Sequence, residues 1–411
     1  MMKDYLILEE NFSLGFLKLF ATKEIDQQEV GMHIDITNNI LKISNHLSSG
    51  SSTAKTYYWP IIETNLIQGC YFEVPAKVFI NILEKLGVQY PISVTLLSER
   101  KFELASHITL PYQQMSLFDS DEIPRKPKLQ NEIDYYIDVS PCESLTQYHQ
   151  AQPRSGVGYL INHSDLRRML SMVCELSKEG NNNRQKSEII LSPEFIDDRW
   201  NLNLFSNSLG KSCSLNSKVN LTRQSIETPI QNCHISFECM KLLNELASVL
   251  PGNIRIETTK TRIIVSQGNC VCSFSQSQNT WDGQKLAQEL RFLDLELFTS
   301  MSLQDLPYTL PKLNVANEKK KARLILRSDP GSTSTTLSIS QDHGTSKWTT
   351  DLPLLSDAIP EPLTLSLWSF EKVINYYRGQ DAYFYFDAQR RRLIFTDKTN
   401  CEYIVLKFEA I

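Results

Sequence analysis

A threefold internal repeat is the feature that most constrains how this chain of 411 residues can fold. An amphipathic helix, a strand, a polar turn and a second strand follow one another at residues 71–106, 233–267 and 365–397. Apolar residues recur in each helix at i, i+3, i+4 and i+7, a spacing that lines one buried helix face. They are Phe79, Ile82, Leu83 and Leu86, then Cys239, Leu242, Leu243 and Leu246, then Phe370, Val373, Ile374 and Tyr377. Three copies of one phrase predict three successive domains of similar architecture.

Further predicted elements, which we call the front half of each repeat, precede each copy of this helix and hairpin. The first two front halves contain a strand, a helix and a hairpin, within residues 4–44 and 158–206. The third has an apolar segment at 292–310 and a hairpin at 322–340 over an Asp-Pro-Gly turn. Two polar stretches without periodicity, 119–134 and 275–288, are typical of linkers. We therefore predict an α+β chain with domains at 1–127, 128–278 and 279–411, each with two helices packed on antiparallel sheets.

Charge and cysteine content favour a soluble, cytoplasmic protein. The 42 basic and 47 acidic residues give a net charge of −5, which excludes coating of nucleic acid by bulk charge but allows a local basic surface. The sequence contains no apolar run of membrane-spanning length, and its first residues are acidic where a signal peptide would be basic. Nine cysteines without a CxxC pair fit a reducing compartment better than a disulfide framework.

No motif of catalysis, cofactor binding or metal binding is present. The segment "LFSNSLGKS" ends like a phosphate-binding loop, but Phe205 stands where the loop needs its first glycine. The seven histidines are scattered and have no cysteine or histidine neighbour at a metal-ligand spacing. These absences favour a non-enzymatic binding or scaffolding protein without cofactors, although catalytic groups can also be assembled from distant parts of a chain.

The arrangement resembles the bacterial sliding clamp, the β subunit of the replicative DNA polymerase III. The overlay is closest in the first repeat, through "IDITNNILKIS", "EVPAKVFINILEKLG" and "ISVTLLSERKFELAS". In the third repeat "NEKKKARLIL" and the tail "YIVLKF" also look like the family's segments. The family's middle-domain signature Thr-Asp-Gly-His-Arg-Leu is not matched by "SNSLGKS", and Lys407 replaces a proline of the tail.

The resemblance implies a head-to-tail homodimer that forms a ring around duplex DNA and acts as a processivity factor for a DNA polymerase. It places DNA contacts without sequence specificity in the loops after the first helix of each domain. The corresponding residues are Lys23, Asn183, Arg184, Lys186, Lys319, Lys320 and Lys321, with Arg167 and Arg168 as weaker candidates. It also implies that polymerase and clamp-loader peptides bind beside the last strand, at Ile404, Leu406 and Phe408.

Two alternatives remain open from the sequence. The segment "QMSLF" at 114–118 looks like the short peptide by which client proteins bind bacterial clamps, so the chain could be a clamp partner. The unmatched signatures also allow a clamp-like scaffold in a recombination, repair, defence or plasmid system. Solution mass and DNA retention separate a ring from both alternatives.

Overall fold

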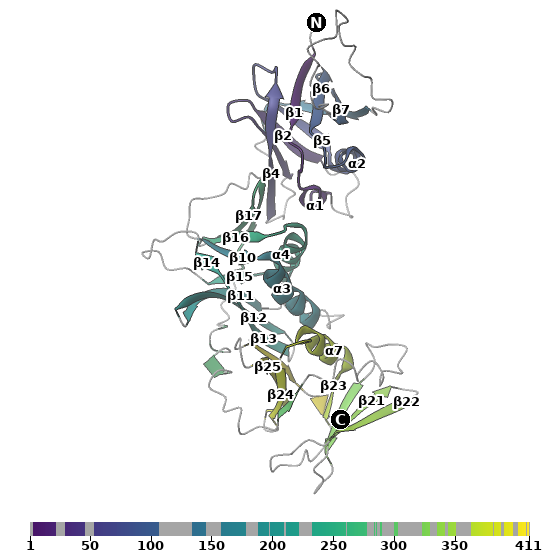
Figure 1. Cartoon of the computed structure of the whole chain (residues 1–411), viewed down its shortest axis with the longest axis vertical. Coiled ribbons are helices and arrows are strands. Elements are labelled where there is room, and N and C mark those ends of the chain that lie inside the picture. Colours follow the sequence, from purple (N-terminus) through teal and green to yellow (C-terminus); the bar gives the residue numbers. More distant parts are fainter. Residues whose placement is uncertain are drawn as a thin grey trace, which may run out of the picture. The chain divides into compact units, whose positions relative to one another are not determined.

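The computed structural model describes most of the chain, which forms two compact units (Figure 1). The described residues are 3–21, 29–45, 53–106, 134–144, 158–177, 188–196, 198–208, 211–221, 232–259, 261–277, 283, 285, 288–289, 300–302, 323–328, 335–341, 344–350, 363–380, 382–387, 390–397, 402–407 and 409–410.

Unit 1 contains the first repeat and most of a three-stranded segment from the second. Its elements are β1 (Asp4–Leu8), α1 (Leu14–Lys18), β2 (Glu29–Asp35), β3 (Ile40–Asn45), β4 (Thr53–Thr64), β5 (Cys70–Pro75), α2 (Ala76–Leu86), β6 (Ile92–Ser98), β7 (Lys101–Ser106), β8 (Tyr135–Asp138), β9 (Ser140–Cys142), β16 (Asn253–Thr258), β17 (Arg262–Gln267) and β18 (Cys270–Ser275).

Unit 2 contains the rest of the second repeat and the third. Its elements are β10 (Gly158–Asn162), α3 (His163–Ser177), β11 (Glu188–Ile196), β12 (Arg199–Ser208), β13 (Lys211–Lys218), β14 (Asn220–Leu221), β15 (Cys233–Ile235), α4 (Phe237–Val249), β19 (Ser300–Ser302), β20 (Arg323–Ser328), β21 (Thr335–Gln341), β22 (Gly344–Thr350), β23 (Leu363–Ser366), α7 (Leu367–Tyr376), β24 (Ala382–Asp387), β25 (Arg392–Asp397), β26 (Glu402–Lys407) and β27 (Glu409–Ala410).

The predicted repeat of a helix followed by a hairpin is confirmed. A short strand, a helix and a hairpin follow one another as β5–α2–β6–β7, as β15–α4–β16–β17 and as β23–α7–β24–β25. The two later helices begin at a serine whose hydroxyl accepts a hydrogen bond from the first turn: Ser236 from the Cys239 N–H at 3.2 Å and Ser366 from the Ser369 N–H at 3.3 Å. Helix α2 begins after Pro75 instead, and it ends at Gly87, whose φ of 79° suits glycine.

Helix α1 is shorter than predicted. The segment "FSLGFLKLFATKE" at residues 12–24 is the helix expected within residues 4–44, whereas α1 spans Leu14–Lys18. Gly15 lowers the helix propensity of this segment, and Ser13 does not cap it through its side chain. Phe16 and Leu17 are nevertheless fully buried, so the segment still contributes its apolar face to the core.

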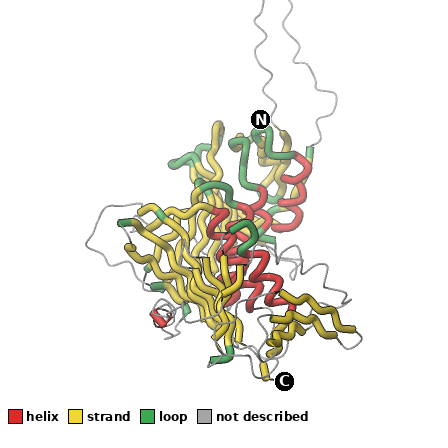
Figure 2. The backbone as a smooth tube through the Cα atoms, turned by 60° about the horizontal axis from the view of Figure 1, so that its bottom comes forward, coloured by secondary structure: helices red, strands yellow, loops and turns green. Residues whose placement is uncertain are grey.

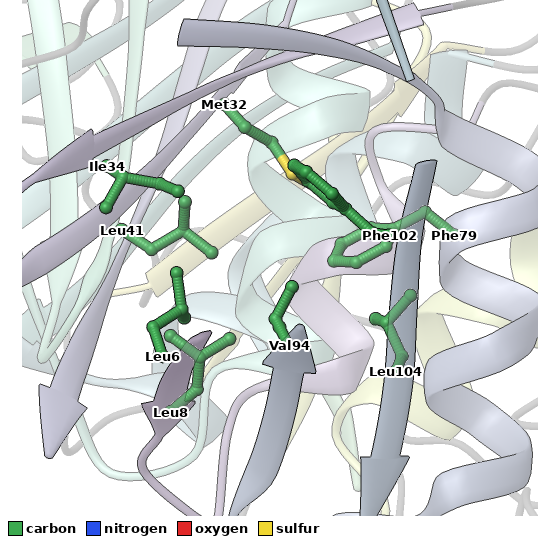
Figure 3. Close-up of a pocket in the computed structure, with 9 residues that line it drawn as sticks. All are labelled: Leu6, Leu8, Met32, Ile34, Leu41, Phe79, Val94, Phe102 and Leu104. Carbon is green, nitrogen blue, oxygen red and sulfur yellow. The ribbon is translucent and has the colours of Figure 1, made fainter. Parts of the chain in front are cut away.

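The core of unit 1 lies between the strands and helix α2. Side chains from β1, β2, β3, β6, β7 and α2 surround an apolar cavity of about 10 Å³, about the size of one water molecule (Figure 3). Its lining residues are Leu6, Leu8, Met32, Ile34, Leu41, Phe79, Val94, Phe102 and Leu104. The alternation of the strands therefore directs Met32 and Ile34 into this core and His33 and Asp35 away from it.

Two antiparallel joints connect the repeats. In unit 1, β18 of the second repeat pairs with β4 of the first, with Cys270 opposite Tyr57. In unit 2, β26 of the third repeat pairs with β13 of the second, with Cys213 opposite Ile404. The two joints are topologically equivalent. Strands β18 and β26 are each the third strand after their helix. Strands β4 and β13 are each the last of three consecutive paired strands, β2–β3–β4 and β11–β12–β13.

Candidate nucleic-acid and partner interface

The helices lie together beside the strands in each unit (Figure 2). In unit 1, α1 contacts α2, and in unit 2, α3 contacts both α4 and α7. Figure 1 shows α3 and α4 side by side next to β10 to β13. Each of these helices buries apolar residues on one side and exposes polar residues such as Lys18, Lys77 and Arg167 on another.

The five helices α1, α2, α3, α4 and α7 together carry almost no net charge. Their basic residues are Lys18, Lys77, Lys85, Arg167, Arg168, Lys241 and Lys372, and their acidic residues are Glu84, Asp165, Glu175, Glu238, Glu245 and Glu371. Several are neutralised locally, by the Lys18–Glu84 ion pair and by the Lys372–Glu175 pair at 3.6 Å. As a group, these helices therefore offer little electrostatic attraction to phosphates.

The predicted DNA contacts are not part of these helices in the sequence. Lys23 follows α1, and Asn183, Arg184 and Lys186 follow α3. These residues, together with Lys319, Lys320 and Lys321, lie outside the described residues, as do Phe408 and the segment 114–118.

The two weaker arginine candidates separate in the structure. Arg167 is exposed on α3. Its neighbour Arg168 forms an ion pair with the fully buried carboxylate of Glu402, at 2.8 Å between Nη2 and Oε1. Arg168 is thus turned toward β26, and its partner could not be recognised from the position of Arg168 in the sequence. The available signal was the position of Glu402, two residues before Ile404 and hence on the same strand face.

Two of the three predicted peptide-binding residues, Ile404 and Leu406, lie on an inward face of β26. Ile404 and Leu406 are buried, on the side of the strand that carries Glu402. The opposite side presents Tyr403, Val405 and Lys407. There Val405 packs with Tyr385 and Ile394, and Tyr383 and Tyr403 are partly exposed against this cluster. A partner reaching β26 from solvent meets the tyrosine side first.

Other chemistry is absent from the described part of the chain. No group of three or more His, Cys, Asp or Glu residues there is arranged to hold a metal ion. Eight cysteines in the same residues are free, and burial raises the pKa of Cys213, Cys233 and Cys270 to about 12. None of the helices described is long and apolar enough to cross a membrane.

Comparison with known proteins gives a uniform result at the level of structure. No protein-family model and no curated protein sequence matches the chain. Among solved structures, the DNA polymerase sliding clamp of Caulobacter crescentus is similar over 99% of this chain and 100% of its own, with a TM-score of 0.71 and 8% identity.

Two further clamps extend this similarity to other bacteria. The Bartonella birtlesii sliding clamp bound to griselimycin matches with a TM-score of 0.70, 14% identity and 100% coverage of both chains. The DNA polymerase III β subunit of Thermotoga maritima matches with a TM-score of 0.68 and 10% identity, over 99% of this chain and 100% of its own. The chain therefore has the fold of the bacterial DNA polymerase III β sliding clamps, along its whole length.

Proposed function

We propose that the protein is a non-enzymatic DNA sliding clamp, which encircles duplex DNA as a homodimer and tethers a DNA polymerase or another DNA-processing enzyme. The observation that carries the proposal is the full mutual coverage with clamps at TM-scores of about 0.7. A fold shared at 8–14% identity does not by itself fix function, so the proposal also needs support from the surfaces of this chain.

Unpaired strand edges support a head-to-tail dimer. The β18–β4 and β26–β13 joints each pair the third strand after a helix with the last of three consecutive paired strands. Among the described strands, β8 is the third strand after α2 and lies at a sheet end. Strand β22 is the last of the paired strands β20–β21–β22 and also lies at a sheet end. Two copies that pair β8 with the partner's β22 would form two more joints of the same kind and close a ring.

Weak contact with phosphates suits such a ring. A closed ring cannot leave duplex DNA sideways, so it stays on the DNA without a high binding affinity. Strong contacts with phosphates would only slow its sliding. The nearly neutral helices fit this requirement. We propose Lys23, Asn183, Arg184, Lys186, Lys319, Lys320 and Lys321 as the DNA contacts, reached from loops beyond the helices. A protein with this task works where the DNA is, in the cytoplasm of a bacterium.

Polymerase and clamp-loader peptides are the proposed protein partners. We assign their binding to β26, the strand that carries Ile404 and Leu406 and directly precedes Phe408. The partly exposed Tyr383 and Tyr403 on the opposite face of the sheet provide an aromatic surface beside it, and aromatic side chains often anchor extended peptides.

A threading experiment tests the ring. Linear duplex DNA with biotin at both ends is mixed with the protein before or after the ends are blocked with streptavidin. A ring of about 94 kDa, twice the chain mass of 47.2 kDa, should stay on DNA in high salt only when it was added before the block. Equal retention in the two orders would contradict encirclement, and light scattering that detects only monomer at micromolar concentration would contradict the dimer.

The same experiment decides between the proposal and its alternatives. A clamp partner or a scaffold without DNA sliding would show no dependence on the order of addition. If "QMSLF" is a client peptide, deletion of residues 114–118 should abolish binding to a bacterial clamp. Under the ring proposal, that deletion should leave threading intact.

A further inference from the structure

Glu402 is the most completely satisfied buried charge at the joint between β13 and β26. Its side chain has no exposed surface. Oε1 accepts hydrogen bonds from Arg168 Nη2 at 2.8 Å and from the Asn216 N–H at 3.2 Å. Oε2 accepts from Arg168 Nη1 at 2.9 Å and from the Tyr376 hydroxyl at 3.0 Å. The carboxylate thus uses all four of its lone-pair positions.

Arg168 and Tyr376 complete this cluster from two helices. The Arg168 guanidinium binds Glu402 through both terminal nitrogens, the strongest geometry for such a pair, and also lies 4.9 Å from the centre of the Tyr376 ring. Burial and the Glu402 charge both raise the pKa of Tyr376, which keeps its hydroxyl protonated as a donor. Helix α3 of the second repeat and helix α7 of the third are therefore tied to one carboxylate on β26.

The cluster also forms hydrogen bonds with the backbone of β13, just beyond the last residue pair that β13 forms with β26. The paired residues run from Lys211 opposite Leu406 to Ser214 opposite Tyr403. Two residues further on, the Asn216 N–H donates to Glu402 and the Asn216 carbonyl accepts from Arg168 Nη2 at 3.3 Å. The two side chains thus take the hydrogen bonds that another strand residue would otherwise provide.

Apolar burial alone does not define the register of β26. Ile404, Val405 and Leu406 are all buried, although they alternate between the two faces of the sheet. A shift of one residue would exchange these faces while leaving apolar residues on both. The same shift would move Glu402 away from Arg168 and toward the Tyr383, Tyr385 and Val405 side, where its charge would be buried without this partner.

We propose that Arg168, Glu402 and Tyr376 form a latch that sets the register of β26 on β13 and so joins the second and third repeats in one correctly aligned sheet. The latch works by penalising misaligned pairing, because a buried carboxylate without its guanidinium is strongly unfavourable. Arg168 consequently has a structural task and is not one of the DNA contacts.

A disulfide can report this register. The backbone N–H and carbonyl of Asn216 face the β26 side. These groups alternate in direction along a strand, so the N–H and carbonyl of Cys213 face β12 instead. Cys213 and Ile404 are therefore opposite each other without mutual backbone hydrogen bonds. Side chains are closest in such pairs, at a separation that a disulfide can span. Cys213 is native, so Ile404→Cys supplies the second thiol for the aligned register. Val405→Cys faces the other side and reaches Cys213 only after a one-residue slip.

The experiment combines each reporter with Glu402→Gln, oxidises the protein with diamide and measures the linked peptides by mass spectrometry. With Glu402 present, Ile404→Cys should form the disulfide and Val405→Cys should not. Glu402→Gln should lower the Ile404→Cys yield at least threefold and make the Val405→Cys disulfide appear. Arg167→Met, one residue from Arg168 but exposed, should change neither yield.

Unchanged yields of both disulfides in the Glu402→Gln background would overturn the proposal. If Glu402→Gln does not fold, Tyr376→Phe removes one hydrogen bond from the latch with little change in volume. That variant should shift the yields in the same direction by a smaller factor, and unchanged yields there would equally overturn the proposal.

Discussion

Asp35 fixes the turn between β2 and β3 through three hydrogen bonds. Its carboxylate accepts from Lys42 Nζ at 2.7 Å and from the backbone and side chain of Asn38 at 3.2 and 2.8 Å. Asn39 adopts the left-handed conformation with φ of 52°, which asparagine tolerates well. The hairpin itself was predicted from the sequence, whereas the role of Asp35 depends on Lys42 across the hairpin.

The Asp35–Lys42 pair should make stability depend on pH in the acid range. The hydrogen bond from Lys42, followed by those from Asn38, lowers the pKa of Asp35 to about 2 against an ordinary value of 3.8. A lowered folded-state pKa gives stability that is fully present above pH 3.8 and is lost as the pH falls toward 2. Lys42→Met should therefore flatten the decline of the urea midpoint between pH 5 and pH 2.

An exposed lysine provides the comparison for that titration. Lys3→Met removes the same charge from an exposed lysine that does not contribute to the lowered pKa of Asp35, and it should keep the wild-type pH profile. A profile that stays unchanged in Lys42→Met would show that Asp35 does not gain its stability from this lysine.

Strand β26 shows how far an element can be predicted from its pattern. The alternation in "EYIVLKF" predicted a strand, and the helix-plus-hairpin phrase predicted α7, β24 and β25, because each signal lies within a few residues. Its pairing with β13 could not be predicted, since the partner is far away in sequence and both strands offer apolar residues on two faces. The burial of Glu402 depends on Arg168 and Tyr376, which no local pattern connects to it.

Truncations on the two sides of β26 should have different effects. Leu406→Ala removes a buried side chain and should lower stability by about 2–5 kcal/mol. Tyr403→Ala, on the partly exposed tyrosine side, should leave stability largely intact and weaken binding of a polymerase or clamp-loader peptide by about 1–3 kcal/mol. Thermal melting and fluorescence anisotropy with a labelled peptide measure the two quantities.

The opposite outcome of this pair would be equally informative. If Leu406→Ala weakens peptide binding while the melting temperature is kept, the partner reaches Ile404 and Leu406 by displacing what covers them. The peptide site would then lie on the face that carries Glu402, and the latch would border it.

The whole molecule was predictable as a threefold α+β repeat because each repeat carries its own periodic signals. The order of elements, the sheets and the correspondence with clamps all follow from that repetition. The joints β18–β4 and β26–β13 were not predicted, because they form between repeats and depend on strand edges that a linear pattern does not mark. The same holds for the near neutrality of the helix faces, which arises from pairs such as Lys18–Glu84 on different helices.

Charge reversal in the third repeat tests the DNA-facing assignment. Changing Lys319, Lys320 and Lys321 together to glutamate should lower the slope of log affinity against log salt by about 0.9 for each lost phosphate contact. Stability should change little, because exposed lysines contribute little to it. Lys3→Glu serves as the single-site comparison, and an unchanged salt slope in the triple variant would remove these lysines from the DNA contacts.

The joint between β13 and β26 has a consequence for synthesis of the protein on the ribosome. Strand β26 lies roughly 190 residues after β13 in the sequence. At a translation rate of about 5–20 residues per second, the edge of β13 therefore stays unpaired for roughly 10–40 s before β26 is synthesised. An open edge strand can pair with another nascent chain in that time. The joint between β4 and β18 imposes a similar delay on the first repeat. Trigger-factor-like chaperones that shield strand edges, or codons that speed translation after β13, should thus raise the yield of native protein.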